Sequence, residues 1–283
     1  MKNDNDLQFF EKSYTFLKSL WSELKHSKEI YGKEDSKTLK RYYSAWLKGE
    51  KYFSYAIYYT ALRQMHLLKC MREGMKILDA GCGTGTEAIF YGLSGADVLG
   101  IDISDTRLKL AQKRKNYYEK KNNVKLKVNF SLNNIFNISG LFDIIWINEA
   151  ISHIHPYEDF IKLCFNRLKK GGKLIIADTN KMNPVFFYRA KKEQKRSGGI
   201  ITVKKEHKTG DDILYAVERI FTIYQIQTLM SALFKNIKLY PIGYIPFFFY
   251  NIFPNITRAI EQIVQYIPII RNFSGSYILL CTK

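Results

Sequence analysis

Short apolar runs alternate with helical patterns between Met75 and Asp178, and this alternation limits the possible folds more than any other feature. The runs occupy residues 75–79, 97–101, 124–130, 142–148 and 173–178. Strands that are almost wholly apolar are usually buried on both faces, as in a parallel sheet covered by helices. Right-handed strand–helix–strand units produce such a sheet. The pattern therefore predicts an α/β fold with a doubly wound, mostly parallel sheet.

The regions before Met75 and after Asp178 show different sequence patterns. Residues 1–70 show apolar side chains at spacings of three and four, typical of helices, interrupted by a polar stretch at 30–41 that predicts a connector. Eight aromatic residues fall between Tyr42 and Tyr59, and they either pack the helices or help to cover a ligand. After the central region, a helix from Thr222 to about Phe234 and strands near 236–241 and 276–282 are expected.

Two further segments look like insertions. Residues 180–211 are basic, and eight Lys or Arg between 185 and 208 surround a flexible Ser-Gly-Gly, which predicts a solvated loop or hairpin. Residues 241–272 are apolar, with four of the six prolines and only three charged residues. If exposed, this second segment suits contact with a membrane, a partner or an apolar ligand; if packed on the core, it is a lid.

Composition narrows the classes of function. The 283-residue chain has 44 Lys and Arg against 26 Asp and Glu, a net charge of +18, which attracts polyanions, although a compositional bias can produce the same excess. Four scattered cysteines form no CxxC pair, so a structural zinc site and a disulfide framework are disfavoured and no metal is expected. No signal peptide or simple transmembrane helix is recognisable, and a cytoplasmic protein is expected.

A glycine-rich segment, Asp79 to Thr86, follows one strand and opens a helix. Glycines let a ligand approach the backbone, and the helix N-terminus offers N–H donors. Asp102 ends the next strand, where a carboxylate can accept ribose hydroxyls. Thr86 replaces the last glycine of a dinucleotide motif, and Asp79 would repel a pyrophosphate but attract an ammonium beside a sulfonium. S-adenosylmethionine (SAM) is therefore favoured over NAD, and the absence of GK[ST] excludes a P-loop.

The segments ILDAGCGTG and GIDIS resemble the first two motifs of class I SAM-dependent methyltransferases. Later segments of that family are matched in order at 142–145, 149–154 and 168–174. The resemblance is good over 70–180, loose over 212–283 and absent from 1–70. It implies SAM as cofactor and a Rossmann-like, seven-stranded, mostly parallel sheet. It also implies a methyltransferase domain at 71–283, with 180–211 and 241–272 as lid insertions at the carboxyl edge. Residues 1–70, helical by their apolar spacing, then form an N-terminal extension to this domain.

The resemblance also implies a set of cofactor-binding positions. They are Asp79, Gly81, Cys82, Gly83, Gly85, Asp102, Ile103, Asn134, Ile135 and Glu149. Asn134 stands where the family often has an acid that contacts the adenine amine. Its side-chain carbonyl can still accept a hydrogen bond, with less assistance from charge. Glu149 is expected to hold the cofactor loop rather than to move a proton.

Methyl transfer to a hydroxyl needs alignment of the acceptor and a general base. His153 matches the family's histidine in an E-x-x-x-H stretch common in small-molecule and lipid-precursor methyltransferases, and His155 follows two residues later. Both are candidate catalytic residues. The alternatives are a structural histidine bonded to a backbone carbonyl for His153 and a helix-start residue for His155. Asp178, at the end of the fifth run, is a weaker base candidate.

The expected acceptor is a small apolar or amphipathic molecule, with transfer to oxygen favoured. The Asn/Asp-Pro-Pro-aromatic motif of enzymes that methylate base amines is replaced by Asn-Glu-Ala-Ile at 148–151, so nucleic acid is not the favoured acceptor. Basic and apolar insertions suit a lipid-like acceptor with an anionic head, and peripheral membrane contact through 241–272. The alternatives are an RNA methyltransferase that uses the basic surface and a non-catalytic subunit that stabilises a partner. The sequence leaves the oligomeric state open.

Overall fold

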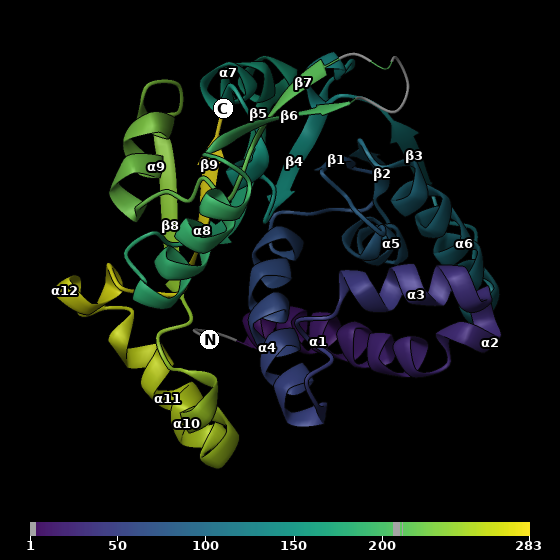
Figure 1. Cartoon of the computed structure of the whole chain (residues 1–283), viewed down its shortest axis with the longest axis horizontal. Coiled ribbons are helices and arrows are strands. Elements are labelled where there is room, and N and C mark those ends of the chain that lie inside the picture. Colours follow the sequence, from purple (N-terminus) through teal and green to yellow (C-terminus); the bar gives the residue numbers. More distant parts are fainter. Residues whose placement is uncertain (1–3, 206–209, 211) are drawn as a thin grey trace.

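A seven-stranded sheet forms the centre of the computed structural model, which describes residues 4–205, 210 and 212–283 (Figure 1). The strand order is β3-β2-β1-β4-β5-β9-β8. The strands are β1 (Lys76–Ala80), β2 (Asp97–Asp102), β3 (Val128–Leu132), β4 (Phe142–Asn148), β5 (Leu168–Thr179), β8 (Asn236–Ile242) and β9 (Ser276–Thr282). β1 to β5 are parallel, and β9 runs antiparallel to both its neighbours. The predicted doubly wound, mostly parallel sheet is confirmed.

Helices cover both faces of the sheet because side chains alternate along each buried strand. Ile144 and Trp146 of β4 face one apolar cluster, whereas Ile145 and Ile147 face the other. The first cluster includes side chains of α5 (Thr86–Leu93) and α6 (Asp105–Asn122), and the second includes side chains of α7 (Tyr157–Arg167) and α9 (Ile223–Ser231). Two short 3₁₀ helices, η1 (Ile135–Asn137) and η2 (Ile151–His153), follow β3 and β4.

The described part of the N-terminal region is mostly helical. It forms α1 (Asp4–Lys25), α2 (Ser27–Tyr31), α3 (Lys33–Tyr42) and α4 (Glu50–Leu68). The expected connector at 30–41 is therefore wrong. Its Lys and Arg residues are exposed, but Leu39 is fully buried and the hydroxyls of Ser27 and Ser36 bond at 2.7 Å, which fixes one face of each short helix. Leu17 and Leu20 share one apolar cluster with Ile77 of β1.

The basic insertion contains a helix followed by a hairpin. α8 (Pro184–Arg196) precedes β6 (Ile201–Lys205) and β7 (Asp212–Ala216), which pair antiparallel. The expectation of a loop is wrong for 185–196, because Asn183 caps the helix by accepting from the N–H groups of Val185 and Phe186. The hairpin is confirmed, and residues 206–208 of that prediction lie outside the described residues.

The apolar insertion folds into three short helices, visible at the lower left of Figure 1. They are α10 (Phe247–Ile252), α11 (Pro254–Val264) and α12 (Pro268–Arg271). Pro254 and Pro268 occupy first-turn positions, where proline lacks only an N–H that would have no partner within the helix. In the part of the chain that the structure describes, no helix is long and apolar enough to cross a membrane.

Candidate functional site

A cavity of about 840 Å³ opens where β1, β2 and β4 end. The carboxyl edge of a parallel sheet is the usual place for a ligand in such folds. The residues predicted for the site that line it are Asp79, Gly81, Cys82, Asp102, Ile103, Asn134, Ile135, Glu149, His153 and His155. Gly83 and Gly85 belong to the same loop but are not among the described residues of the cavity wall. The predicted positions therefore converge on one place.

Gly83 and Gly85 determine the shape of the loop. Their φ angles are 54° and 77°, in the left-handed region that favours glycine. A Cβ on Gly85 would lie 2.6 Å from the ring of Phe130 and 2.9 Å from the Cβ of Ala111. A Cβ on Gly83 would collide with the phenol of Tyr42. These glycines therefore let the loop turn tightly into α5 rather than forming the cavity surface.

Asp79 is an acid without a full set of partners. Its side chain is 3% exposed, and its Oδ2 has no hydrogen-bond partner among the described residues. Burial raises the pKa of Asp79 well above its usual range, and the neighbouring carboxylate of Glu87 raises it further. Burial also raises the pKa of Glu87, which lines the same cavity. A buried acid beside a half-buried one attracts a cation, because a positive charge between them offsets both desolvation and repulsion.

Asp102 is held in a fixed orientation by the backbone. Its Oδ2 accepts from the N–H of Gly83 and its Oδ1 from the N–H of Ser104, both at 2.9 Å. A carboxylate has about four acceptor positions, so further lone pairs can receive hydroxyl donors from the cavity. The geometry suits the role expected for Asp102 with a ribose.

Asn134 and Ile135 lie beyond β3 and line the cavity with Phe136. The Oδ1 of Asn134 accepts from the N–H of Phe136 at 3.1 Å and thereby caps η1. One lone pair of this oxygen is thus committed to the backbone, and the second can accept from a ligand. Asn134 therefore caps η1 and can also accept a hydrogen bond from an amine of a ligand in the cavity.

The N-terminal region also lines the cavity, through the last residue of α3 and the segment between α3 and α4. Tyr42, Tyr43 and Trp46 line it. Arg63 of α4 donates to Glu149 Oε1 at 2.6 Å and to Ser276 Oγ at 2.7 Å. The guanidinium lowers the pKa of Glu149. The cluster of aromatic residues in the sequence was the available signal for these contacts.

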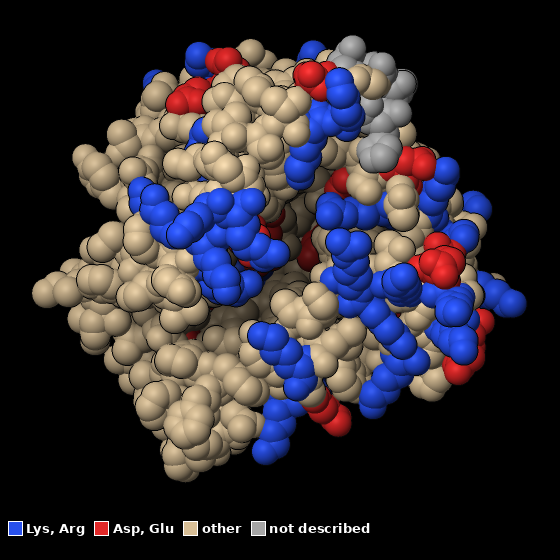
Figure 2. Space-filling view, in the orientation of Figure 1, with Lys and Arg blue, Asp and Glu red and all other residues tan. Residues whose placement is uncertain are grey.

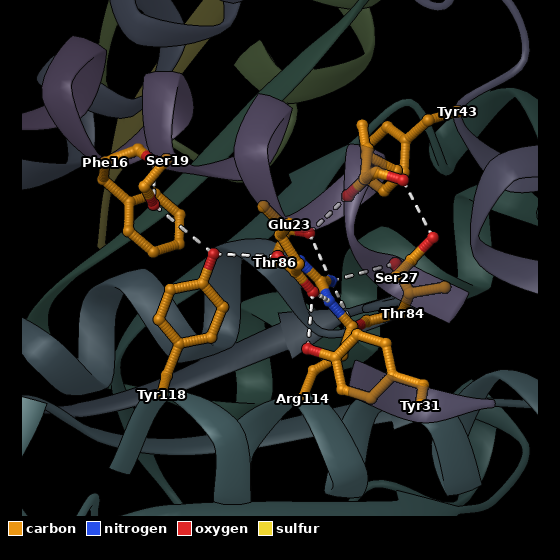
Figure 3. Close-up of polar contacts among 11 residues, drawn as sticks. Phe16, Ser19, Glu23, Ser27, Tyr31, Tyr43, Thr84, Thr86, Arg114 and Tyr118 are labelled. Atoms are coloured by element: carbon orange, nitrogen blue, oxygen red, sulfur yellow. Dashed lines mark hydrogen bonds and ion pairs between the residues drawn. The ribbon is translucent and has the colours of Figure 1, made fainter. Parts of the chain in front are cut away.

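A buried ion pair connects α1 to the glycine loop (Figure 3). Arg114 donates from Nε to Glu23 Oε1 at 2.6 Å and from Nη2 to Oε2 at 2.9 Å, and both side chains are fully buried. The same guanidinium donates at 2.7 Å to the carbonyl of Thr84 and to the hydroxyl of Thr86. Burial opposes ionisation of Glu23, but the attraction of Arg114 leaves its pKa below the usual value. The loop conformation therefore depends on a residue of the first helix.

His153 lies between the main sheet and the hairpin. Its Nδ1 is 3.3 Å from the carbonyl oxygen of Ala216, its Nε2 is 3.7 Å from Glu218 Oε1, and its ring stacks on Tyr215. When Nδ1–H donates to that carbonyl, the lone pair of Nε2 is free to accept a proton. The Nδ1 of His155 instead accepts from Arg219 at 3.2 Å. The carbonyl contact fits both interpretations of His153, structural and catalytic.

A second cavity of about 520 Å³ adjoins the first, and Trp46, Glu149 and His153 line both. Asp178 lies in its wall, 2% exposed, and accepts from the N–H groups of Ser152 and Thr179. Burial raises the pKa of Asp178 to about 6. Figure 2 shows a central hollow with acidic atoms in its depth and Lys and Arg at its rim.

Comparisons with known proteins agree with this geometry. A family model described as a methyltransferase domain matches residues 71–222. A rat mitochondrial ubiquinone biosynthesis O-methyltransferase is 33% identical over 110 residues, which cover 38% of this chain and 32% of the relative. The chain thus spans about a third of the length of that curated relative.

Solved structures share the fold. Phosphoethanolamine N-methyltransferase 2 of Haemonchus contortus, solved with SAM, superimposes with a TM-score of 0.52 and 16% identity, covering 77% of this chain and 51% of its own. Magnesium protoporphyrin IX methyltransferase of Synechocystis, solved with the demethylated product, gives a TM-score of 0.53 and 13% identity, covering 88% and 95%. At these identities the likeness establishes the fold alone.

Proposed function

Since the chain belongs to the methyltransferase-domain family and has the class I SAM-dependent methyltransferase fold, we propose that it transfers a methyl group from SAM to a hydroxyl of a small, apolar or amphipathic acceptor. The buried, incompletely partnered carboxylate of Asp79 supports this proposal most directly. It lies below a glycine loop, in a cavity that adjoins a second one at His153. Such an arrangement suits a cationic methyl donor beside a separate acceptor.

The residues of the first cavity fit SAM. The bound cofactor supplies a methyl group on a sulfonium, whose sulfur leaves readily. Asp79 and Glu87 provide the negative charge for its ammonium and sulfonium, and Asp102 provides acceptors for the ribose hydroxyls. Asn134 and Ile135 flank the position proposed for the adenine. Glu149, held by Arg63, shapes the loop between the cofactor and the acceptor.

His153 is the proposed general base. The acceptor hydroxyl gives its proton to Nε2, and the oxygen forms a bond to the methyl carbon as the carbon–sulfur bond breaks and leaves its electron pair on sulfur. Ala216 orients the ring through Nδ1, and Glu218 stabilises the protonated imidazole. His155 is a second candidate, although Arg219 engages its Nδ1. The name of the curated relatives, O-methyltransferase, supports transfer to oxygen.

The reaction type can be tested with radiolabelled SAM and matched acceptors. Phenols and catechols are compared with anilines of the same shape, and the products are identified by mass spectrometry. We expect methyl ethers from the hydroxyl compounds. Methylation of the anilines alone would contradict oxygen transfer while leaving SAM-dependent methylation intact.

We also propose that α10–α12 rest on an anionic membrane surface and place the protein peripherally on a cytoplasmic face. The exposed apolar side chains of this insertion include Phe248, Phe249, Ile252, Phe253, Ile256, Ile263 and Ile269. Two of its three charged residues bond inward: Arg258 donates to Tyr250, and Glu261 accepts from Tyr59. The exposed apolar side chains and the net charge of +18 suit anionic lipid.

Liposome flotation tests this membrane contact. Phe248→Ser with Phe249→Ser should reduce binding to phosphatidylglycerol vesicles several-fold, because each loses an exposed ring without disturbing the core. Phosphatidylcholine vesicles should bind less well than the anionic ones. Unchanged flotation of the variant would contradict membrane contact. If the variant instead lost a dimer seen by light scattering, the exposed apolar side chains would form a protein interface.

A further inference from the structure

The second cavity has a cationic wall. α8 contributes Arg189, Lys192 and Arg196 to its lining. These residues are three and four positions apart, so they lie along one face of the helix. Lys191 and Lys195 of the same helix are not among the described lining residues. Only the basic residues on one face of α8 therefore line the cavity, although α8 carries other basic residues as well.

An aromatic wall belongs to the same cavity. Tyr52, Tyr55 and Tyr59 of α4 line it, again at spacings of three and four, and Trp46 closes the side that borders the cofactor cavity. Glu261 holds Tyr59 by accepting from its hydroxyl at 2.7 Å. Flat, preorganised rings favour an aromatic or otherwise apolar ligand body over an extended polar one.

Most acids around this cavity already have partners. Glu149 pairs with Arg63 at 2.6 Å, and Glu193 pairs with Arg196 at 2.9 Å. Glu218 lies beside His153, and Asp178 accepts from two backbone N–H groups.

Two cations of α8 have fewer ionic partners than these acids. Within the described residues, no carboxylate oxygen lies within 4.0 Å of Arg189 or Lys192, although the charge of Arg189 helps to lower the pKa of Glu149. The wall formed by α8 therefore carries two cations that make no direct ion pair and can bind an anion directly.

We propose that this cavity is the acceptor site and that it selects a phenol with an acidic substituent. The acidic group binds Arg189 and Lys192, the ring packs on the tyrosines of α4, and the hydroxyl lies at His153 beside the cofactor cavity. This inference rests on the proposed function, because it names the class of acceptor for the proposed methyl transfer. Guanidinium and ammonium groups together recognise a carboxylate or a phosphate, whereas a neutral phenol leaves both cations without a partner.

Calorimetric titration of the full-length protein with 4-hydroxyphenylacetate and its neutral methyl ester tests this selection. Titrations are made with and without S-adenosylhomocysteine, so that failure of cofactor binding and failure of acid recognition are measured separately. The acid should bind about tenfold more tightly than the ester, as expected for charge-assisted hydrogen bonds. 4-Hydroxyphenyl phosphate in the same assay distinguishes a phosphate site from a carboxylate site.

Arg189→Gln with Lys192→Gln should reduce the preference for the acid to about twofold or less without changing the affinity for S-adenosylhomocysteine. Lys191→Gln with Lys195→Gln removes the same number of positive charges from the same helix and should retain the preference. Equal affinity for acid and ester in the unmodified protein, including no detectable binding of either, would overturn the proposal. Preference that survives in the Arg189 and Lys192 variant would also overturn it.

Discussion

Asp79 has opposite effects on stability and on ligand binding. Asp79→Asn keeps the shape of the side chain but removes a buried acid whose ionisation is opposed by burial and by Glu87, so the free energy of unfolding without ligand should rise by about 1–2 kcal/mol. Affinity for SAM should fall about 10- to 100-fold, because an amide cannot offset the ammonium charge. Urea denaturation and calorimetry measure the two effects. A less stable variant with unchanged SAM affinity would assign Asp79 to structure alone.

His153 and His155 should differ in their importance for catalysis. His153→Gln removes the proposed base and should lower kcat about 100-fold or more while SAM affinity stays the same. His155→Gln is the matched control two residues away and should lower kcat less than about tenfold, because its Nδ1 already accepts from Arg219. Steady-state kinetics with a phenol that the protein methylates checks both. Equal losses, or a loss of SAM affinity with His153→Gln, would favour the structural role.

Asp178 should make stability depend on pH. Its pKa is about 6 in the folded chain against an ordinary 3.8, so the unfolded chain loses this proton first as pH rises. The ionised carboxyl therefore destabilises the fold progressively between about pH 4 and 6, to about 3 kcal/mol above that range. The unfolding free energy of the unmodified protein, relative to that of Asp178→Asn, should fall by about 2–3 kcal/mol from pH 4 to pH 7. A difference independent of pH would contradict the assignment.

At the scale of elements, α1 and the glycine loop should behave as one unit. Glu23→Gln leaves Arg114 buried without its counter-charge, so unfolding free energy should fall by about 3–5 kcal/mol. SAM affinity should fall as well, because Arg114 also holds Thr84 and Thr86. Denaturation and calorimetry of the folded fraction measure both.

The control for that prediction is a surface ion pair between α3 and α6, Asp35 with Lys113. Asp35→Asn should cost less than about 1 kcal/mol and leave SAM affinity unchanged, because solvent screens exposed charges. If Glu23→Gln were as mild as this control, α1 would not support the loop.

The sequence predicts the elements best where one physical signal dominates. Apolar runs predicted the parallel strands, although the run at 124–130 begins four residues before β3, and Asp79 with the glycines predicted the loop that borders the first cavity. The helices at 30–41 and 184–196 were missed because their polar residues outnumber the one or two buried side chains, such as Leu39 and Ala190, that fix them. Covering a ligand was one of the two roles expected for the aromatic residues at 42–59, and Tyr42 and Trp46 line the first cavity. The contact of Arg63 with Glu149 depends on packing between elements far apart in the chain, which a local pattern does not encode.

At the scale of the whole molecule, the N-terminal helices and the sheet share one apolar cluster, and both cavities lie between regions that are distant in sequence. The predicted division at residue 70 stays a proposal. Acidic side chains occupy the depth of the hollow and basic ones its rim (Figure 2), an order that suits a cationic donor inside and an anionic acceptor near the opening.

Calorimetric titration of SAM into the full-length protein, with Asp79→Asn titrated beside it, tests the central claim most directly. The expected result is micromolar binding of one SAM per chain that is weakened at least tenfold in the variant, with circular dichroism showing that both are folded. Failure of the folded, unmodified protein to bind SAM would contradict the claim and support a non-catalytic protein with a methyltransferase fold.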